Sequence, residues 1–153
     1  MFLVNTRKCL KVFKKVYVSS DSKEILELAE SIGAIPILRG KELCGDTPNI
    51  PVYQDALRHM GDVDGIIAVQ ANSPTISISI IGLVKRIMGM GIDEVMTCHE
   101  GYSIYGSVWA LSSFRLKNYP EEDIYHPKPN VLIVDKSVDI HTLEDYKLAL
   151  KQK

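Results

Sequence analysis

The order of apolar runs and amphipathic segments along the chain predicts an α/β fold. In such a fold, helices cover both faces of an open, mostly parallel sheet, which makes a three-layer domain. The chain has 153 residues, enough for one domain with its own core. Hydrophobic residues make up 46% of it and charged residues 24%, the usual composition of a globular protein. We therefore expect a single domain over residues 1–153.

Short apolar runs are predicted to form the strands. They cover residues 16–19, 34–38, 66–69, 94–98, 104–111 and 131–134. Pro36 places the second run at an edge of the sheet, because proline has no N–H to donate to a neighbouring strand. The alternation of these strands with helices implies right-handed crossover connections.

Amphipathic segments between these runs are predicted to be helices. Asp21 and Glu24 form an N-cap and N3 pair before the first, and Gly33 suits the position after its end. Asn49 is expected to cap the second helix, with Pro51 near its first turn. The other segments are a helix over about residues 77–90, a short turn of helix near 112–116, and a terminal helix over 143–150 that Thr142 caps.

The charge balance argues against polyanionic partners. The net charge is −1, from 18 basic and 19 acidic side chains. This balance creates no field that would attract nucleic acid or anionic lipid. A basic run, made of Lys8, Lys11, Lys14 and Lys15, is expected to form the solvated side of a short N-terminal helix.

Cysteine usage and hydropathy favour the cytoplasm. Cys9, Cys44 and Cys98 are odd in number and far apart, with neither metal-ligand spacing nor a disulfide framework. No apolar run approaches the length of a membrane span, and the run at residues 1–4 is too short for a signal peptide. We expect a soluble cytoplasmic protein without nucleic-acid or membrane partners.

A polar cluster follows the apolar run at residues 66–69. Gln70, Asn72 and Ser73 come directly after it, and Pro74 prevents the strand from continuing. Ligands of open α/β sheets bind at the carboxyl ends of the strands, so this cluster is a candidate site. The alternative is an ordinary loop with capping residues.

Asp139 and His141 form a second candidate, just after the last predicted strand. They are two residues apart, so in extended backbone they point the same way. A carboxylate and an imidazole on one face can share a divalent cation. The alternative is that both are loop residues before Thr142. Asp62 and Asp64 also have metal-ligand spacing, but they precede a strand and so lie at its amino end, which is the wrong end for a site.

Anion binding is the candidate role of two further residues. Arg39 follows the second predicted strand and could hold a phosphate or carboxylate through two hydrogen bonds. Asn49 stands where a helix N-terminus could receive an anion. A surface arginine and an ordinary helix cap are the alternatives.

Four segments in order along the chain resemble one known family, the acylneuraminate cytidylyltransferases, which include the synthetases that activate 3-deoxy-octulosonic acid. The segments read VYVSSDSKEILELAESIGA, ILRGKELCGDT, IIAVQANSPT and VDIHTLEDYKLA. They match the family's strand and Ser-Thr-Asp, its Arg-Pro-x-x-Leu-x-x-Asp-Thr loop, its Gln-Pro-Thr-Ser-Pro-Leu-Arg and its Asp-Ile-Asp-Thr-x-x-Asp. The resemblance covers nearly the whole chain and implies a nucleotide-diphospho-sugar transferase-like, GT-A-like fold.

The resemblance also implies an activity. Enzymes of this family transfer CMP from CTP to the anomeric hydroxyl of an acidic 2-keto-3-deoxy sugar and release pyrophosphate, with Mg²⁺ as cofactor. It implies that Gln70 and Ser73 line the nucleotide or sugar pocket.

Further roles follow from the same resemblance. It implies that Arg39 and Asn49 lie at the nucleotide edge of the cleft. Asp139 would be the first metal carboxylate, and His141 takes the position of the second.

The chain departs from the family pattern in several places. It starts after the family's first strand and its glycine- and lysine-rich triphosphate loop, which the basic run near the N-terminus does not replace. The family's Pro-Leu-Arg reads Pro74-Thr75-Ile76, and the insertion used for sugar binding and dimerisation is missing between Cys98 and Tyr102.

Two hypotheses follow from these departures. The chain is either a working cytidylyltransferase, or a catalytically degenerate nucleotide- or sugar-binding module or subunit completed by another chain. A glycosyltransferase of similar topology is a weaker third. A sheet edge left open by the missing strand would favour self-association.

Overall fold

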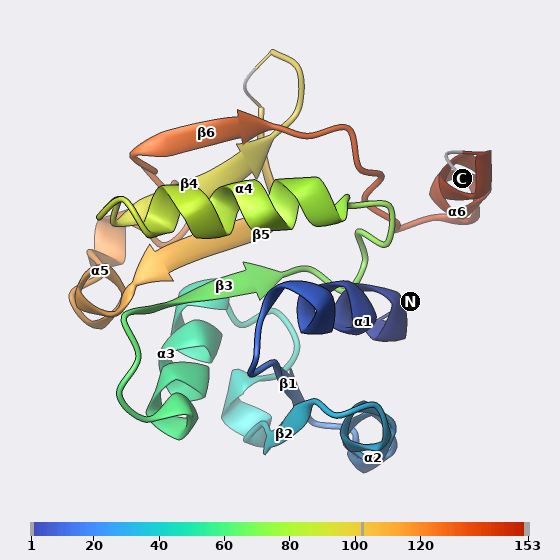
Figure 1. The fold of residues 1–153 in the computed structure, drawn as a ribbon, viewed down its shortest axis with the longest axis horizontal. Coiled ribbons are helices and arrows are strands. Elements are labelled where there is room, and N and C mark those ends of the chain that lie inside the picture. Colours follow the sequence, from blue (N-terminus) through green and yellow to red (C-terminus); the bar gives the residue numbers. More distant parts are fainter. Residues whose placement is uncertain (1, 102, 152–153) are drawn as a thin grey trace.

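The computed structural model describes residues 2–101 and 103–151 and leaves out the side chain of Tyr105. Helices and strands follow one another as Figure 1 labels them. The helices are α1 (Phe2–Val12), α2 (Lys23–Ser31), α3 (Asn49–Met60), α4 (Ile78–Met88), α5 (Ser113–Lys117) and α6 (Leu143–Lys151). The strands are β1 (Tyr17–Ser20), β2 (Ile35–Leu38), β3 (Gly65–Val69), β4 (Glu94–Cys98), β5 (Ile104–Ser112) and β6 (Val131–Val134).

The strands of the described residues form two sheets, so the expectation of one continuous sheet is wrong. β1 and β2 pair in parallel, and the second sheet has the order β3-β5-β4-β6. β5 runs antiparallel to β3 and β4, whereas β6 is parallel to β4. Because residues 99–103 join β4 to β5 directly, β5 must turn back beside β4, since a parallel return needs a longer crossover. The fold class, α/β, is confirmed, but the sheet is mixed.

The sequence predicts that the family's insertion is absent between Cys98 and Tyr102. Tyr102 lies outside the described residues. Within the described strands, β1 pairs with β2 on one side and β3 pairs with β5 on one side. Each of these two strands therefore has one free edge. Pro36 lies in β2, whose partner is β1, so the expected edge position of this proline is confirmed.

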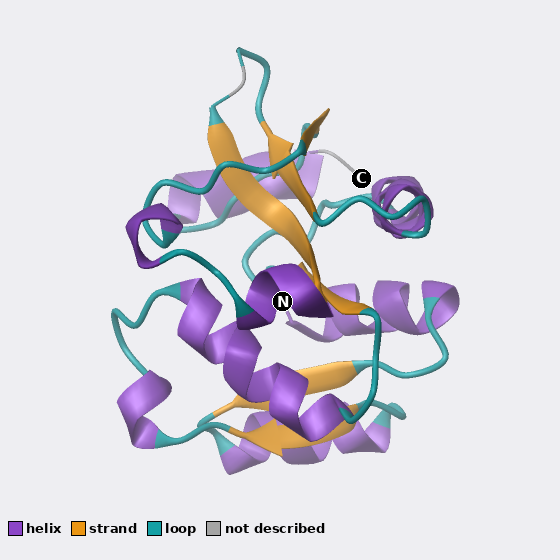
Figure 2. Ribbon diagram, turned by 90° about the vertical axis from the view of Figure 1, so that its left-hand side faces the viewer, coloured by secondary structure: helices purple, strands orange, loops and turns teal. Residues whose placement is uncertain are grey.

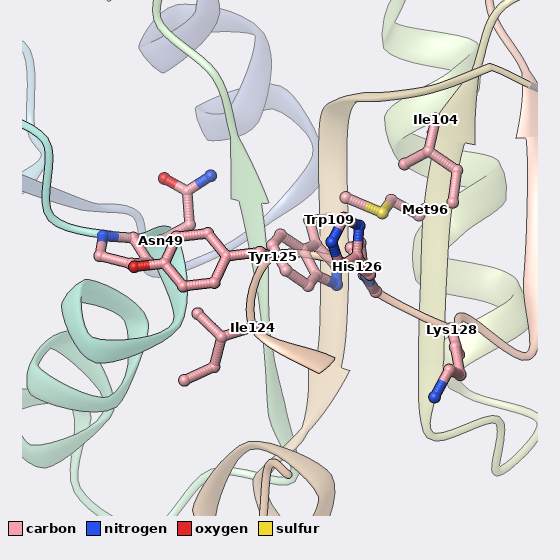
Figure 3. A pocket seen from close by; sticks show the side chains of 10 residues that line it. Asn49, Met96, Ile104, Trp109, Ile124, Tyr125, His126 and Lys128 are labelled. Atoms are coloured by element: carbon pink, nitrogen blue, oxygen red, sulfur yellow. The ribbon is translucent and has the colours of Figure 1, made fainter. Parts of the chain in front are cut away.

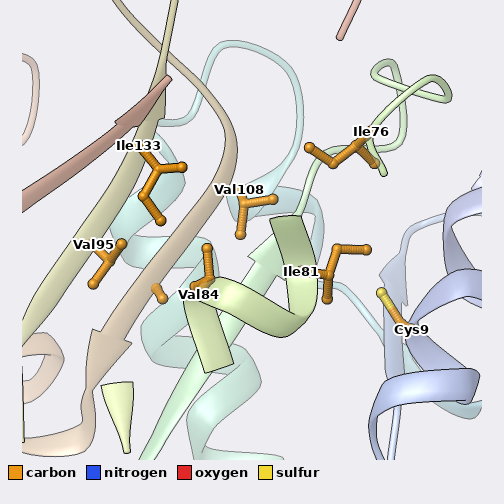
Figure 4. Packing of buried hydrophobic residues seen from close by; sticks show 8 residues of the cluster. Cys9, Ile76, Ile81, Val84, Val95, Val108 and Ile133 are labelled. Atoms are coloured by element: carbon orange, nitrogen blue, oxygen red, sulfur yellow. The ribbon is translucent and has the colours of Figure 1, made fainter. Parts of the chain in front are cut away.

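Helices cover both faces of the larger sheet (Figures 1 and 2). On one face, Ile81 and Val84 of α4 pack with Cys9 of α1 against Val95 and Val108 of the sheet (Figure 4). The other face packs against α3 and α5 through a second cluster, which includes Ile50, Leu57, Trp109, Leu111 and Leu116. These two apolar layers give the three-layer arrangement, and side-chain alternation along β5 sends Val108 to one layer and Trp109 to the other.

Two expected helix caps are wrong by one residue. Ser22, rather than Asp21, caps α2, and its Oγ accepts a hydrogen bond from Ile25 N at 3.3 Å. Pro48 is the N-cap of α3, so Asn49 is the first helical residue, and no side-chain cap bond is found there in the described structure. Proline fixes φ near its observed −57° just outside the helix. The cap of α6 is confirmed, since Thr142 Oγ1 accepts from Asp145 N at 3.2 Å.

The basic run near the N-terminus is only partly solvated. Lys8 Nζ donates to the carbonyl oxygens of Pro74 (2.6 Å) and Ile76 (2.8 Å), so the expectation of a solvated lysine is wrong for Lys8. Its partial burial lowers the pKa of its ammonium group. Asn5, also on α1, is buried and donates to the same loop. Helix α1 is thereby fixed to the segment that follows β3. No helix among residues 2–101 and 103–151 is long and apolar enough to cross a membrane.

Candidate functional site

The loop after β3 is held on two sides by hydrogen bonds. Gln70 N donates to Ser107 O of β5 at 2.9 Å. Asn5 Nδ2 donates to Gln70 O at 2.7 Å and to Ser73 O at 3.0 Å. Ser73 is fully buried. The polar residues predicted at the end of this strand therefore lie in a loop in which the carbonyls of Gln70 and Ser73 accept hydrogen bonds from α1.

Asn72, Asp139 and His141 form what we call the Asp139 cluster. Asn72 Nδ2 donates to Asp139 Oδ1, and His141 Nε2 lies 2.7 Å from Asp139 Oδ2. The side chain of Asp139 is 25% exposed and that of His141 69%. Ile140 N also donates to Asn72 O at 2.9 Å, so the backbone brings the two loops together. The spacing predicted that Asp139 and His141 point the same way, and the two side chains are in contact.

A buried carboxylate anchors the segment that carries Asp139. Asp135 follows β6 and accepts from the hydroxyls of Ser107 (2.7 Å) and Ser137 and from Ser137 N (3.1 Å). Ser107 Oγ lies 2.8 Å from Thr97 Oγ1, which extends the network into β4. Val138 N donates to Thr75 Oγ1 at 2.7 Å. The segment at residues 135–141 is thus attached to the ends of β4 and β5 and to the loop after β3.

Arg39, Tyr53 and Gln70 form what we call the Tyr53 cluster. Gln70 Nε2 lies 3.3 Å from Tyr53 Oη. Burial raises the pKa of Tyr53, and the positive charge of Arg39 opposes that rise. Arg39 itself donates to Ser19 of β1, from Nε to Oγ (3.2 Å) and from Nη2 to the carbonyl oxygen (3.0 Å). Arg39 therefore bonds to β1 of the small sheet, and Gln70 joins the end of β3 to α3.

Asn49 lies at a pocket on the α3 side of the larger sheet. The pocket has a volume of about 700 Å³, and its walls include Asn49, Met96, Trp109, Tyr125, His126 and Lys128 (Figure 3). We call it the Trp109 pocket. Tyr53 stands one turn after Asn49 on α3, and its ring meets that of Trp109 edge-on at 5.7 Å. Asn49 thus belongs to the pocket, which adjoins the Tyr53 cluster.

Hydrogen bonds and loop contacts bring five of the polar residues discussed above together: Gln70, Asn72, Ser73, Asp139 and His141. Tyr53 bonds Gln70, stands one turn after Asn49 on α3, and has its pKa influenced by the charge of Arg39. Asn72 belongs to the polar cluster predicted as a candidate site, but its contact with Asp139 was not predicted, and Tyr53 was missed. The signal for Tyr53 was its position four residues after Asn49 on one helix.

The Asp139 cluster offers an incomplete set of metal ligands. Asp139 supplies one carboxylate, His141 one imidazole, and Asn72 one amide whose oxygen could turn inward. No group of three or more histidine, cysteine, aspartate or glutamate side chains suited to a metal is found in the described chain. Mg²⁺ usually takes one or two carboxylates together with waters and substrate phosphates, whereas imidazole suits Mn²⁺ and other transition metals better. A divalent cation at this cluster would need most of its ligands from water or substrate.

Comparisons with known proteins give a similarity of fold. No model of a known protein family matches the chain, and no curated protein sequence does. A crystal structure of Rv0371c from Mycobacterium tuberculosis H37Rv in complex with manganese aligns with a TM-score of 0.67 at 10% identity, over 97% of this chain and 85% of that one. Another structure of Rv0371c aligns with a TM-score of 0.68 at 9% identity, over 98% and 82%. At such low identity, the similarity concerns the arrangement of helices and strands.

Proposed function

We propose that the chain is a cytidylyltransferase-like protein that transfers CMP from CTP to an acidic 2-keto-3-deoxy sugar. The observation that carries the proposal is the Asp139 cluster, in which Asn72, Asp139 and His141 meet at the carboxyl ends of β3 and β6. This is where ligands of open α/β sheets bind. The order of the motifs along the chain supports the same family and the same GT-A-like topology.

Asp139 and His141 would hold a divalent cation beside the phosphates of the nucleotide. Such a cation supplies charge neutralisation and orients the phosphate groups. The manganese in the Rv0371c structure is a reason to test Mn²⁺ beside Mg²⁺. Gln70 would contact the nucleotide or the sugar, and Ser73 would shape the loop from its buried position.

Arg39 and Asn49 would bind the nucleotide edge of the site. Arg39 has already engaged its Nε and one Nη with Ser19, which leaves part of its guanidinium for an anionic ligand. The work of the chain is therefore positioning, since phosphate and nucleophile need to be held in line rather than altered covalently by a side chain.

The activity test is pyrophosphate release. The protein is incubated with CTP and with acidic sugars of eight or nine carbons, in Mg²⁺ or in Mn²⁺. We expect release that requires CTP, sugar and cation together. Asp139→Ala should abolish it, whereas Asp62→Ala, at the amino end of β3, should leave it unchanged. Release no greater than that of a buffer blank would contradict the transferase proposal.

A second candidate is a nucleotide-binding module, or a subunit completed by another chain. The free edges of β1 and β3 favour this candidate. Among the described residues, neither a strand nor a glycine-rich loop that could hold a triphosphate lies between these two edges. Contacts to the outer phosphates of CTP would then be few. Calorimetric titrations distinguish the two candidates: similar affinities for CMP and CTP favour the module, whereas tighter binding of CTP favours the transferase.

A further inference from the structure

Charge is distributed unevenly along the chain. Residues 1–20 carry five basic side chains and no acidic one, and residues 65–92 carry two basic side chains and no acidic one. The rest of the chain has 11 basic and 19 acidic side chains, a net charge of −8. The net charge of −1, from which no lipid partner was expected, therefore hides a separation of charge between two parts of the molecule.

Helices α1 and α4 bring the two basic segments together. Both helices cover the same face of the larger sheet and pack against each other (Figure 1). Lys85 Nζ donates to Val12 O at 2.8 Å, which joins the ends of the two helices. Six cations are exposed on α1, on α4 and just after α1: Arg7, Lys11, Lys14, Lys15, Lys85 and Arg86. We call this surface the α1–α4 face.

The cations of the α1–α4 face are not neutralised within the protein. None of the six forms an ion pair with a carboxylate of residues 2–101 or 103–151. Lys11, Lys85 and Arg86 lie in the last turns of their helices, where the helix dipole attracts a cation, but the dipoles do not account for the other three. The face ends at α2, which packs against α1 and carries three exposed glutamates: Glu24, Glu27 and Glu30.

Large apolar side chains are exposed among these cations. Val4 of α1 is 44% exposed, Leu83 of α4 38%, and Met90, which follows α4, 75%. On each helix the two kinds of side chain share one side, because Val4 precedes Arg7 and Leu83 precedes Arg86 by three residues. Basic and apolar side chains together suit the surface of an anionic bilayer, where cations meet lipid phosphates and apolar groups enter the acyl boundary.

The same side chains suit nucleic acid less well. A phosphate backbone would use the cations and leave Leu83 and Met90 without a favourable contact. The exposed side chains that define the α1–α4 face also include no aromatic ring on which a base could stack.

We propose that the α1–α4 face binds the surface of an anionic lipid bilayer. Each lysine or arginine near such a surface strengthens binding about fivefold, and the attraction weakens as salt is added. This function goes beyond CMP transfer and requires neither nucleotide nor metal ion.

The test is sedimentation of the whole protein with lipid vesicles, without CTP or metal. One set of vesicles contains phosphatidylcholine and phosphatidylglycerol in equal parts, and the other contains phosphatidylcholine alone. We expect at least about tenfold tighter binding to the anionic vesicles, and weaker binding when salt is raised from about 0.1 M to about 0.5 M. No binding, or equal binding to both sets, would overturn the proposal.

Variants locate the binding surface. Lys11→Gln combined with Arg86→Gln should weaken binding to the anionic vesicles about 25-fold, since two cations are lost. Lys41→Gln combined with Lys117→Gln changes the net charge equally but leaves the α1–α4 face intact, so its binding should change by less than about twofold. Circular dichroism confirms that all variants are folded. Equal losses in the two double variants would overturn the assignment to this face.

The apolar contribution separates a bilayer from other anionic partners. Leu83→Gln should weaken vesicle binding at least about threefold, whereas Leu148→Gln, at an exposed leucine of α6, should not. Tighter binding to a DNA duplex than to the anionic vesicles would overturn the choice of a bilayer. So would an unchanged vesicle affinity in Leu83→Gln.

The result is independent of the activity test. A protein that releases no pyrophosphate but binds anionic vesicles through Lys11 and Arg86 keeps this surface and loses the proposed transferase. A protein that releases pyrophosphate but binds neither set of vesicles does the reverse.

Discussion

Asp139 uses both of its carboxylate oxygens, one toward Asn72 and one toward His141. A bound cation would have to replace at least one of these contacts. These hydrogen bonds order the three side chains in the folded protein without a ligand. Binding at this cluster would therefore lose less side-chain conformational entropy. This arrangement makes substitutions at single positions informative about the candidate site.

The first prediction concerns metal binding by Asp139. Replacing it with asparagine removes the charged ligand, so Mn²⁺ affinity should fall at least about tenfold. Titration calorimetry with Mn²⁺ measures the change. Asp62→Asn is the matched control and should bind Mn²⁺ as the unaltered protein does. An equal loss in the two variants would contradict a site at Asp139.

The second prediction concerns Glu94, whose carboxylate is buried beneath the Trp109 pocket. It accepts from Trp109 Nε1 (3.1 Å), Tyr119 Oη (3.0 Å) and Arg115 Nε (2.8 Å). Glu94→Gln removes the negative charge that pairs with the guanidinium of Arg115. We therefore expect a loss of about 3 kcal/mol in the free energy of unfolding. Urea unfolding followed by tryptophan emission measures it. Glu27→Gln, on the exposed side of α2, should change stability by less than about 0.5 kcal/mol.

At the scale of elements, the segment after β6 is attached to the loop after β3 by backbone donors. Val138 N donates to Thr75 Oγ1 and Ile140 N to Asn72 O. Thr75→Val removes one acceptor while keeping the side-chain shape. We expect a loss of about 1–3 kcal/mol in unfolding free energy, because Val138 N is left unsatisfied.

The same variant tests whether this attachment also positions Asp139. Mn²⁺ affinity should fall in Thr75→Val, although Thr75 is not a proposed ligand. Thr47→Val, which removes hydroxyl bonds to the carbonyls of Glu42 and Cys44, is the control and should leave Mn²⁺ affinity unchanged. Unaltered Mn²⁺ affinity in Thr75→Val would mean that the loops are joined without effect on the site.

The segment at residues 118–130 gives a pH-dependent prediction. The hydrogen bond from Lys128, together with the charges of Lys128 and Arg115, lowers the pKa of Asp123. The folded protein thus keeps this carboxylate ionised at pH values where the unfolded chain, with a pKa of about 4, takes up a proton. The stabilisation is present above about pH 4 and is lost as the pH falls through the lower folded pKa.

Asp123→Asn removes this dependence. Urea unfolding between about pH 6 and pH 2 gives the free energy of unfolding of both proteins. The unaltered protein should be the more stable one, and this difference in free energy should become smaller below about pH 4. Asp46→Asn, on an exposed turn, is the control. If the difference in unfolding free energy between the unaltered protein and Asp123→Asn stayed constant from about pH 6 to about pH 2, ionisation of Asp123 would not be the source of the pH dependence.

Continuous apolar runs predicted the position of the strands well. The apolar runs at residues 94–98 and 131–134 match β4 and β6 in both bounds. The direction of β5 was not predictable from its own residues, because it depends on the short connection that precedes it. Caps were wrong by one residue where two candidates were adjacent, as with Asp21 and Ser22. Tyr53 was missed because its contacts cross from a helix to Trp109 in β5 and to Gln70 in the loop after β3.

At the scale of the whole molecule, the free edges of β1 and β3 predict self-association. An open edge presents unpaired N–H and C=O groups to a second copy. Sedimentation velocity over a range of protein concentrations should show a species larger than the monomer. A monomer at every concentration would contradict the prediction.

The division into two sheets has a consequence for motion. The segment with β1, α2 and β2, residues 17–38, has no backbone ladder to the larger sheet among the described strands, and it packs against α1 through α2. Its amide hydrogens should therefore exchange with solvent at a lower opening free energy than those of β4 and β5. A nucleotide that contacts both Arg39 and Gln70 would link this segment to the larger sheet. Its binding would then slow exchange along β1 and β2, although it touches only their ends.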